Sequence, residues 1–181
     1  MARQYKRKPK AEQPLPAVKP ITHIETWDEY FILQAQLVAL KSKDRSTKVG
    51  CVIVGDGNIL LSTGYNGFPR GVNDDVDSRH ERPDKYSWTE HAERNAVFNA
   101  ARHGIKLAGS RAYLNFEPNP CADCTRALIQ AGIVEIIGPN RSFVGKGTGV
   151  HYHINYAEEM LKEAGVKQRV FVVPDEVFNS F

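Results

Sequence analysis

A histidine, a glutamate and two cysteines are the residues of this sequence whose types and spacing are best suited to chemistry. His91 and Glu93 are separated by one alanine, and Cys121 and Cys124 are separated by two residues. One imidazole and two thiolates provide three ligands for Zn²⁺ and leave the fourth tetrahedral position open, as in catalytic rather than structural zinc sites. Because zinc brings the pKa of a bound water to about 7, the pattern predicts a metal that activates water.

Both halves of this group are expected at the starts of helices. Pro120 directly precedes Cys121, and proline is typical of the first helical turn. The N–H groups and the dipole of a helix N-terminus lower the pKa of thiols, which makes thiolates available to the metal. Glu93 lies close enough to His91 to accept a proton from the activated water without binding the metal itself.

Other interpretations of each half exist. A CxxC pair is also found in redox-active proteins and in structural zinc knuckles, and HxE is common by chance. The combination of both halves, each followed by a helical pattern, favours the catalytic metal over these interpretations.

The rest of the sequence predicts an α/β fold around this group. Apolar residues at Tyr30, Leu33, Leu37 and Leu40 recur at helical spacing, and Gly55-Asp56-Gly57-Asn58 is a hairpin signal between two apolar runs. The expected helices are 26–43, 91–103, 121–131 and 156–164, and the expected strands are 48–54, 59–63, 111–116, 134–138 and 170–173. This order predicts a three-layer α/β/α sandwich with a mixed five-stranded sheet, with the site at one edge of the sheet.

Length, charge and cysteine content limit the function classes. The 181 residues suit one domain, 23–181, preceded by a flexible basic Pro-rich extension over 1–22. The extension carries a local charge of +5, so the remainder is −2, and a broad nucleic-acid surface is not expected. Cys51 stands in an apolar run and is expected in the core. Three cysteines without a disulfide framework favour the cytoplasm, and no apolar run reaches the roughly 20 residues of a membrane span.

The connection over 65–88 is polar and too long for a passive loop in a compact domain. We therefore expect it to shape the pocket or a regulatory site.

Several further runs make the chain resemble the deoxycytidylate (dCMP) deaminase family of the cytidine deaminase-like superfamily. The resemblance covers about residues 27–172. The HAE and PCxxC runs are shared by the whole superfamily, whereas the Gly-Tyr-Asn-Gly stretch and the Asp-Asp/Lys-Tyr insertion narrow the likeness to dCMP deaminases. The matching runs are Ser42-Lys43-Asp44, Lys48-Val49-Gly50, Gly64-Tyr65-Asn66-Gly67-Phe68-Pro69, Asp74-Asp75, Lys85-Tyr86, His91-Ala92-Glu93, Asn95-Ala96 and Gln130-Ala131-Gly132-Ile133.

The resemblance implies an enzyme that converts dCMP to dUMP and ammonia, and so supplies the precursor of thymidylate. His91, Cys121 and Cys124 would bind zinc, and Glu93 would carry the proton. Substrate-binding roles would fall to Asn66, which matches the position that reaches the sugar but also suits a turn beside Gly67, and to Ala92. Candidates for the 5′-phosphate are Ser42, Lys43 and Lys48 from motif position, and Arg70 and Lys85 from local charge.

Regulation and assembly are further implications of the resemblance. Many family members are homo-hexamers that dCTP activates and dTTP inhibits, and an effector nucleotide can carry Mg²⁺. The residues expected at such an allosteric site are Tyr65, Gly67, Phe68, Asp74 and Asp75. Some relatives hold a second, structural zinc in the insertion before HAE. This insertion offers His80 and no cysteine, so one zinc per chain is expected.

Two other functions stay open at this stage. One is a deaminase of another cytosine or purine substrate, such as a nucleoside, a modified dCMP or a base in RNA. The acidic body argues against a nucleic-acid substrate, while the basic extension argues mildly for one. The other is a catalytically inactive, nucleotide-binding relative, against which the presence of Glu93 argues.

Overall fold

The structure is a computed structural model, and it describes residues 23–141, 153–173 and 178. The predicted extension over 1–22 lies outside these residues. Five strands form one sheet in the order β2-β1-β3-β4-β5. Strand β1 pairs antiparallel with β2 and β3, while β3, β4 and β5 run parallel, so the predicted mixed five-stranded sheet is confirmed. The strands are β1 (Gly50–Val54), β2 (Leu60–Tyr65), β3 (Arg111–Leu114), β4 (Glu135–Pro139) and β5 (Lys167–Phe171).

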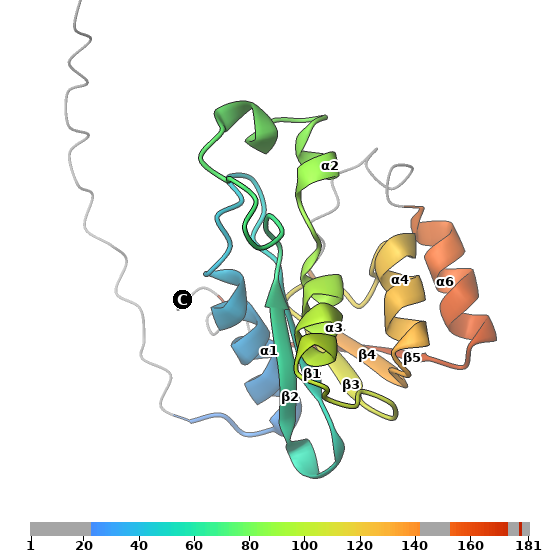
Figure 1. The fold of residues 1–181 in the computed structure, drawn as a ribbon. Helices are drawn as coiled ribbons and strands as arrows, with labels where there is room; N and C mark the ends of the chain where they lie inside the picture. The colour runs from blue at the N-terminus through green and yellow to red at the C-terminus, as the bar shows by residue number, and fades with distance from the viewer. Residues whose placement is uncertain (1–22, 142–152, 174–177, 179–181) are drawn as a thin grey trace, which may run out of the picture.

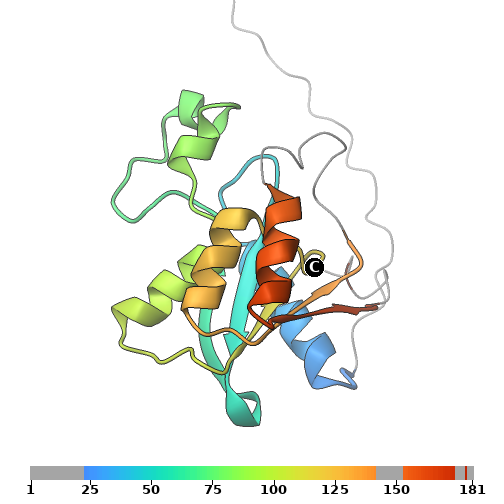
Figure 2. The ribbon, with the colours of Figure 1, turned by 90° about the vertical axis from the view of Figure 1, so that its right-hand side faces the viewer.

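Helices cover both faces of the sheet, as the three-layer prediction requires. Helix α1 (Trp27–Ala39) lies on one face, and α3 (Ala92–Arg102), α4 (Ala122–Gln130) and α6 (Ile154–Glu163) lie on the other (Figures 1 and 2). Alternate residues of β1 enter the two cores, because successive side chains of a strand point to opposite faces. Val52 packs in the α1 core, and Cys51 and Ile53 pack in the core beneath α3 and α4. Cys51 is fully buried, as predicted.

The apolar stripe of α1 is only partly buried. Leu33 is 3% exposed, whereas Tyr30, Leu37 and Leu40 are 37%, 55% and 44% exposed. The helix meets the sheet through a neighbouring face that contains Phe31, Ile32, Ala35 and Ala39. The small residues on that face let the backbone of α1 approach the strand closely, and this face therefore packs against the sheet. The helix ends at residue 39, whereas the sequence predicted an end at residue 43.

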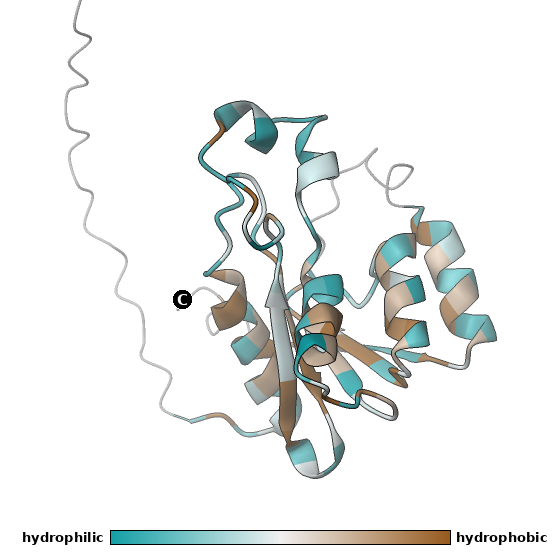
Figure 3. Cartoon of the chain, viewed as in Figure 1, coloured by the Kyte–Doolittle hydropathy of each residue, from teal (hydrophilic) through white to brown (hydrophobic). Residues whose placement is uncertain are grey.

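The connection over 65–88 contains two short helices that the sequence pattern did not predict, η2 (Asp77–His80) and α2 (Lys85–Trp88). It projects beyond the end of the sheet in Figure 1 and is mostly hydrophilic in Figure 3, whereas the strands are hydrophobic. A backbone bridge between Gly67 and Glu90, with N···O distances of 3.0 and 2.9 Å, joins the start of this connection to its end. Other element ends differ from the predicted ones by one to three residues.

Close packing at Gly64 places the N-terminus of α3 on the sheet. A Cβ atom at Gly64 would lie 2.2 Å from the carbonyl oxygen of Ala92 and 2.3 Å from the amide nitrogen of Ala96. Only glycine fits at so close an approach of strand and helix backbones. His91 and Glu93, at the start of α3, are therefore held against the end of β2.

Among the described residues, none of the helices combines the length and the apolar character needed to cross a bilayer.

Candidate active site

The three candidate zinc ligands lie at the starts of two neighbouring helices. His91 is the N-cap residue of α3, Cys121 is the N-cap residue of α4, and Cys124 lies in the first turn of α4. Nδ1 of His91 is 3.3 Å from Sγ of Cys121 and 3.4 Å from Sγ of Cys124. Residues that are 30 and 33 positions apart in the chain are thus brought into contact.

The geometry of this group fits a zinc ion. Its three candidate ligand atoms all lie within 4.8 Å of one another, and within residues 23–141, 153–173 and 178 it is the one cluster of this kind. Zn–N and Zn–S bonds of about 2.1 and 2.3 Å at a tetrahedral angle place the two ligand atoms about 3.6 Å apart. The observed separations of 3.3 and 3.4 Å are close to this value. Imidazole and thiolate are also the ligand types that zinc prefers.

Hydrogen bonding favours the thiolate form of Cys121. A hydrogen bond with Cys124 is the strongest influence on its pKa, which falls to about 4 although burial acts in the opposite direction, and His91 contributes a further hydrogen bond. The thiolate is the form of cysteine that binds metals. The lowered pKa of Cys121 therefore favours the form that binds metals.

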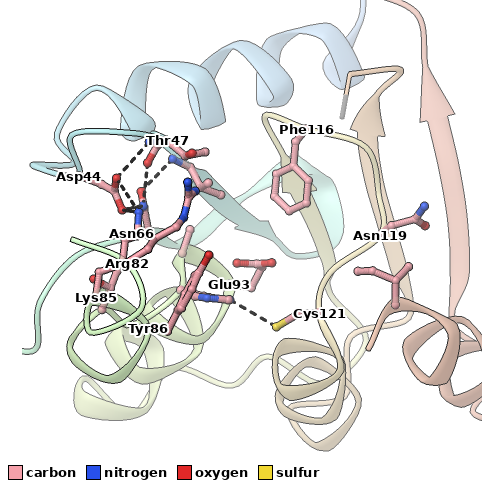
Figure 4. Close-up of a pocket in the computed structure, with 15 residues that line it drawn as sticks. Asp44, Thr47, Asn66, Arg82, Lys85, Tyr86, Glu93, Phe116, Asn119 and Cys121 are labelled. Carbon is pink, nitrogen blue, oxygen red and sulfur yellow. Dashed lines mark hydrogen bonds and ion pairs between the residues drawn. The ribbon is translucent and has the colours of Figure 1, made fainter. Parts of the chain in front are cut away.

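Glu93 is a buried carboxyl group in the same pocket. Its residue is 3% exposed, and burial raises its pKa above the ordinary value. In Figure 4 it lies in the middle of the pocket, between Cys121 and the polar residues around Asn66. A buried glutamate in this position can exchange protons with a bound substrate.

His91 and Cys121 of the metal group line one pocket together with Glu93. Polar and charged residues gather at one end of the pocket, and Phe116 and Asn119 lie at the other (Figure 4). The lining residues are Asp44, Thr47, Val49, Asn66, Arg82, Lys85, Tyr86, Thr89, His91, Ala92, Glu93, Phe116, Asn119, Cys121 and Ile154.

A buried ion pair forms the wall at the polar end. Nζ of Lys85 donates to both carboxylate oxygens of Asp44, at 3.0 and 2.8 Å, and the two side chains are 9% and 7% exposed. Burial acts to raise the pKa of Asp44, but hydrogen bonds from Lys85 and from the amides of Ser46 and Thr47 outweigh it and lower the pKa to about 2. The pair fastens the 42–48 loop to α2.

Asn66 belongs to this wall. Its Oδ1 accepts a hydrogen bond from the amide of Val49 at 2.8 Å, and its Nδ2 donates to the carbonyl of Thr47 at 2.9 Å and to Asp44 at 3.3 Å. One acceptor position of Oδ1 remains for a ligand, because an amide oxygen accepts two hydrogen bonds.

Three sequence-predicted phosphate residues do not line this pocket. Ser42 is buried and donates to the carbonyl of Asn66 at 2.7 Å. Nζ of Lys48 donates to the carbonyl of Ser42 at 2.5 Å, and Lys43 pairs with Asp74 at 2.6 Å. Of the other two candidates, Lys85 lines the pocket, whereas Arg70 is hydrogen-bonded to Asn99 on α3.

A second pocket shares the Asp44–Lys85 wall with the first. Four of the five predicted allosteric residues line it, namely Tyr65, Gly67, Phe68 and Asp74, whereas Asp75 does not. Lys41, Lys43 and His80 line it as well, and the His80 ring stacks on Phe68 with centroids 4.9 Å apart.

The connection over 65–88, which was expected to shape the pocket, supplies Arg82 and Tyr86 to it, although neither was named as a site residue. Sequence reasoning missed Phe116, Asn119 and Ile154. Phe116 and Asn119 stand close before Cys121 in the sequence, so their nearness to the metal group could have been inferred. Ile154 carries no comparable signal, because chain folding and not spacing brings it to the pocket.

Comparison with known proteins agrees with this geometry. The chain is 35% identical over 153 residues to a probable deoxycytidylate deaminase of Drosophila melanogaster, covering 79% of this chain and 71% of that protein. It is 39% identical over 116 residues to the deoxycytidylate deaminase of Homo sapiens, covering 61% of this chain and 63% of that protein. The latter alignment thus spans just under two thirds of the human enzyme.

A solved structure with the same fold is the dCMP deaminase of the cyanophage S-TIM5 in complex with dCMP and dUMP. It superposes with a TM-score of 0.63 at 25% identity and covers 82% of this chain and 100% of that one. Residues 25–138 match the family model of the cytidine and deoxycytidylate deaminase zinc-binding region, a range that contains all three candidate zinc ligands. The chain therefore belongs to the cytidine and deoxycytidylate deaminase family.

Proposed function

We propose that this protein is a zinc-dependent hydrolase that deaminates dCMP to dUMP and ammonia, and so supplies dUMP for thymidylate synthesis. The observation that carries the proposal is the cluster of His91, Cys121 and Cys124 beside buried Glu93 in one pocket. The proposal is also supported by the family to which the chain belongs and by its similarity to a phage dCMP deaminase whose structure was solved with dCMP and dUMP. The catalytic unit is residues 23–181.

Each residue of the metal half has a distinct task in this reaction. His91, Cys121 and Cys124 would hold the zinc, which would supply an acidified water as the nucleophile for C4 of the cytosine ring. Glu93 accepts a proton from that water and delivers it to N3 of the ring. It then transfers the second proton to the amino group, which leaves as ammonia. Water is thereby added and ammonia lost, with no net change of oxidation state.

The rest of the pocket orients the nucleotide. Asn66 has one acceptor position left for the sugar hydroxyl, and Ala92 borders the base at the start of α3. Phe116 provides an aromatic wall close to the metal half, where a pyrimidine ring can be held by apolar contact.

The test is ammonia release by the purified protein from dCMP, deoxycytidine, dCTP and a tRNA substrate. We expect dCMP to be the preferred substrate, with dUMP formed in a one-to-one ratio to ammonia. Preference for deoxycytidine or for RNA would replace this function with another deaminase activity. Absence of turnover with all four, at one zinc per chain, would favour a catalytically inactive nucleotide-binding protein.

The second pocket is where we place an effector nucleotide. Tyr65, Phe68 and Gly67 offer a ring and backbone surface, and Lys41 offers positive charge for phosphates. Mg²⁺ would accompany the effector, with Asp74 and the phosphates as oxygen ligands. Activity titrations with dCTP and dTTP test this, since dCTP should activate and dTTP should inhibit. If the kinetics are hyperbolic and neither nucleotide changes them, the proposal of an effector site is wrong.

Self-association, with a hexamer as the expected state, is supported by the exposed apolar stripe of α1. Tyr30, Leu37 and Leu40 are large apolar residues of α1 and its C-terminal end, and they are 37%, 55% and 44% exposed. Sedimentation velocity of the wild type and of Leu37→Glu tests the assembly, and the variant should dissociate. A wild-type protein that sediments as a monomer would exclude it. The expected compartment is the cytoplasm, because the three cysteines are free thiols, which suit a reducing environment.

A further inference from the structure

We propose that Arg82 binds the 5′-phosphate of the substrate and makes the pocket selective for a nucleotide over a nucleoside. This inference rests on the proposed function, and it assigns the phosphate to a residue in the polar connection before α3. It follows from a charge inventory of the pocket, from the partners of each cation, and from the placement of Arg82.

Apart from His91 of the metal group, the side chains with positive charge that line the pocket are Arg82 and Lys85. Lys85 has no donor left for a ligand. Its ammonium group donates to both oxygens of Asp44 at 3.0 and 2.8 Å and to Oγ of Ser46 at 2.6 Å, which uses all three N–H groups. The positive charge of Lys85 is also cancelled by Asp44. Lys85 therefore builds the wall and does not neutralise a phosphate.

Arg82 is in the opposite situation. Its residue is exposed, and no carboxylate in the described part of the chain pairs with its guanidinium group. The guanidinium carbon lies 5.9 Å from the centre of the Tyr86 ring, a contact that orients the side chain. A guanidinium group with five donors in a planar fork is the side chain best matched to a phosphate. Arg82 thus has both the charge and the donors that Lys85 lacks.

The placement of Arg82 fits the length of a nucleotide. In Figure 4 it lies at the polar end of the pocket with Asp44 and Asn66, away from Phe116 and Asn119. A base at the metal half and a sugar at Asn66 leave the phosphate at this end. The dianion of a phosphate would meet one unneutralised cation there, because Asp44 and Lys85 cancel each other.

The Asp44–Lys85 pair positions Arg82. The amide of Lys85 donates to the carbonyl of Glu81 at 2.8 Å, which closes a turn around Arg82. Because Lys85 is anchored on Asp44, this turn is fixed relative to the 42–48 loop and to Asn66. The phosphate ligand and the sugar ligand therefore share one support.

The experiment compares ligand pairs that differ only in the phosphate. Binding of dUMP and of deoxyuridine is measured by calorimetry, and kcat/KM is measured for dCMP and for deoxycytidine. The variants are Arg82→Gln and Arg82→Lys, with Arg102→Gln as the matched control. Arg102 is an exposed arginine at the end of α3 that does not line the pocket. Zinc content and the unfolding temperature are recorded for each variant.

We expect Arg82→Gln to weaken dUMP binding and dCMP turnover by about 10- to 100-fold and to leave the values for deoxyuridine and deoxycytidine unchanged. Arg82→Lys should lose less dUMP binding and dCMP turnover, because lysine keeps the positive charge but lacks the planar guanidinium group. Arg102→Gln should match the wild type. An equal loss on nucleotide and nucleoside, or no loss on either, would overturn the assignment. A wild type that binds dUMP but releases no ammonia from dCMP would refute the proposed function, while the binding data would still decide on Arg82.

Discussion

The two ends of the active-site pocket are built in different ways. At the metal end, His91, Cys121 and Cys124 stand at the first turns of two helices, and each half of the group is a short run in the sequence. At the polar end, Asp44, Asn66 and Lys85 come from three separate non-helical or short helical segments that meet through side-chain hydrogen bonds. One end is defined by spacing along the chain, and the other by contacts across it.

This difference assigns separate tasks to the two ends. In the proposed function, the metal end performs the chemistry and depends on ligand geometry, while the polar end determines which molecule is held there. The buried ion pair at the polar end is also structural, because it joins the 42–48 loop to α2. We therefore expect changes at the metal end to abolish turnover with little effect on stability, and changes at the Asp44–Lys85 pair to affect stability first.

The largest expected effect is that of Glu93→Gln. Glutamine cannot carry a proton, so kcat for dCMP should fall by about 10²- to 10⁴-fold while zinc content and unfolding temperature stay at the wild-type values. Turnover and zinc are measured on the same preparation. Glu158→Gln on α6 is the matched control, since Glu158 is exposed and does not line the pocket. If Glu93→Gln turns over dCMP at the wild-type rate, Glu93 is not the proton carrier.

Lys85→Met tests the structural role of the polar end. The substitution leaves the Asp44 carboxylate buried without its partner, and the free energy of unfolding should fall by about 3–5 kcal/mol in urea denaturation. The comparison variant is Lys43→Met, whose ion pair with Asp74 is screened by solvent, and its loss of stability should be much smaller than that of Lys85→Met. Adding Asp44→Asn to Lys85→Met should recover part of the loss. Equal costs for Lys85→Met and Lys43→Met would contradict the buried pair.

Acid should weaken the same pair. The pKa of Asp44 is lowered from 3.8 to about 2 in the folded protein, so its stabilising effect is complete above pH 4 and is lost as the pH falls through 2. The contribution is about 2 kcal/mol by linkage. Urea denaturation between pH 5 and pH 2 should therefore show a stability loss that is smaller by this amount in the variant lacking both Asp44 and Lys85. The same pH dependence in both proteins would assign the loss to other groups.

The smallest expected effect is that of Arg126→Ala. The side chains of the Asp123–Arg126 pair on α4 are 60% and 59% exposed, although they flank Cys124 in the sequence. Solvent screens such pairs, so stability should change by about 0.5 kcal/mol or less and zinc content should not change. A large loss of zinc would show that this pair supports the metal end.

The metal group and the strand and helix order were predictable because their signals are local. Ligand spacing, a proline before Cys121 and the helix pattern after each half all lie within a few residues of one another. The sheet followed from alternating strands and helices, although the parallel β5 begins at Lys167, where polar residues hide the strand pattern.

The remainder depends on contacts that spacing does not encode. Lys43, Lys48 and Arg82 are all cations in polar stretches, and nothing in the sequence distinguishes one paired with Asp74 or a backbone carbonyl from one that faces the pocket. The exposed stripe of α1 has the same origin, because the helix is apolar on two faces and the packing against β1 selects one.

Zinc titration of activity tests the central claim most directly. The protein is stripped with a chelator, zinc is returned in measured amounts, and dUMP formation from dCMP is followed at each step. We expect no turnover in the stripped protein and a linear rise in activity that stops at one zinc per chain. Full activity in the metal-free protein, or a protein with one zinc per chain that forms no dUMP, would contradict the account.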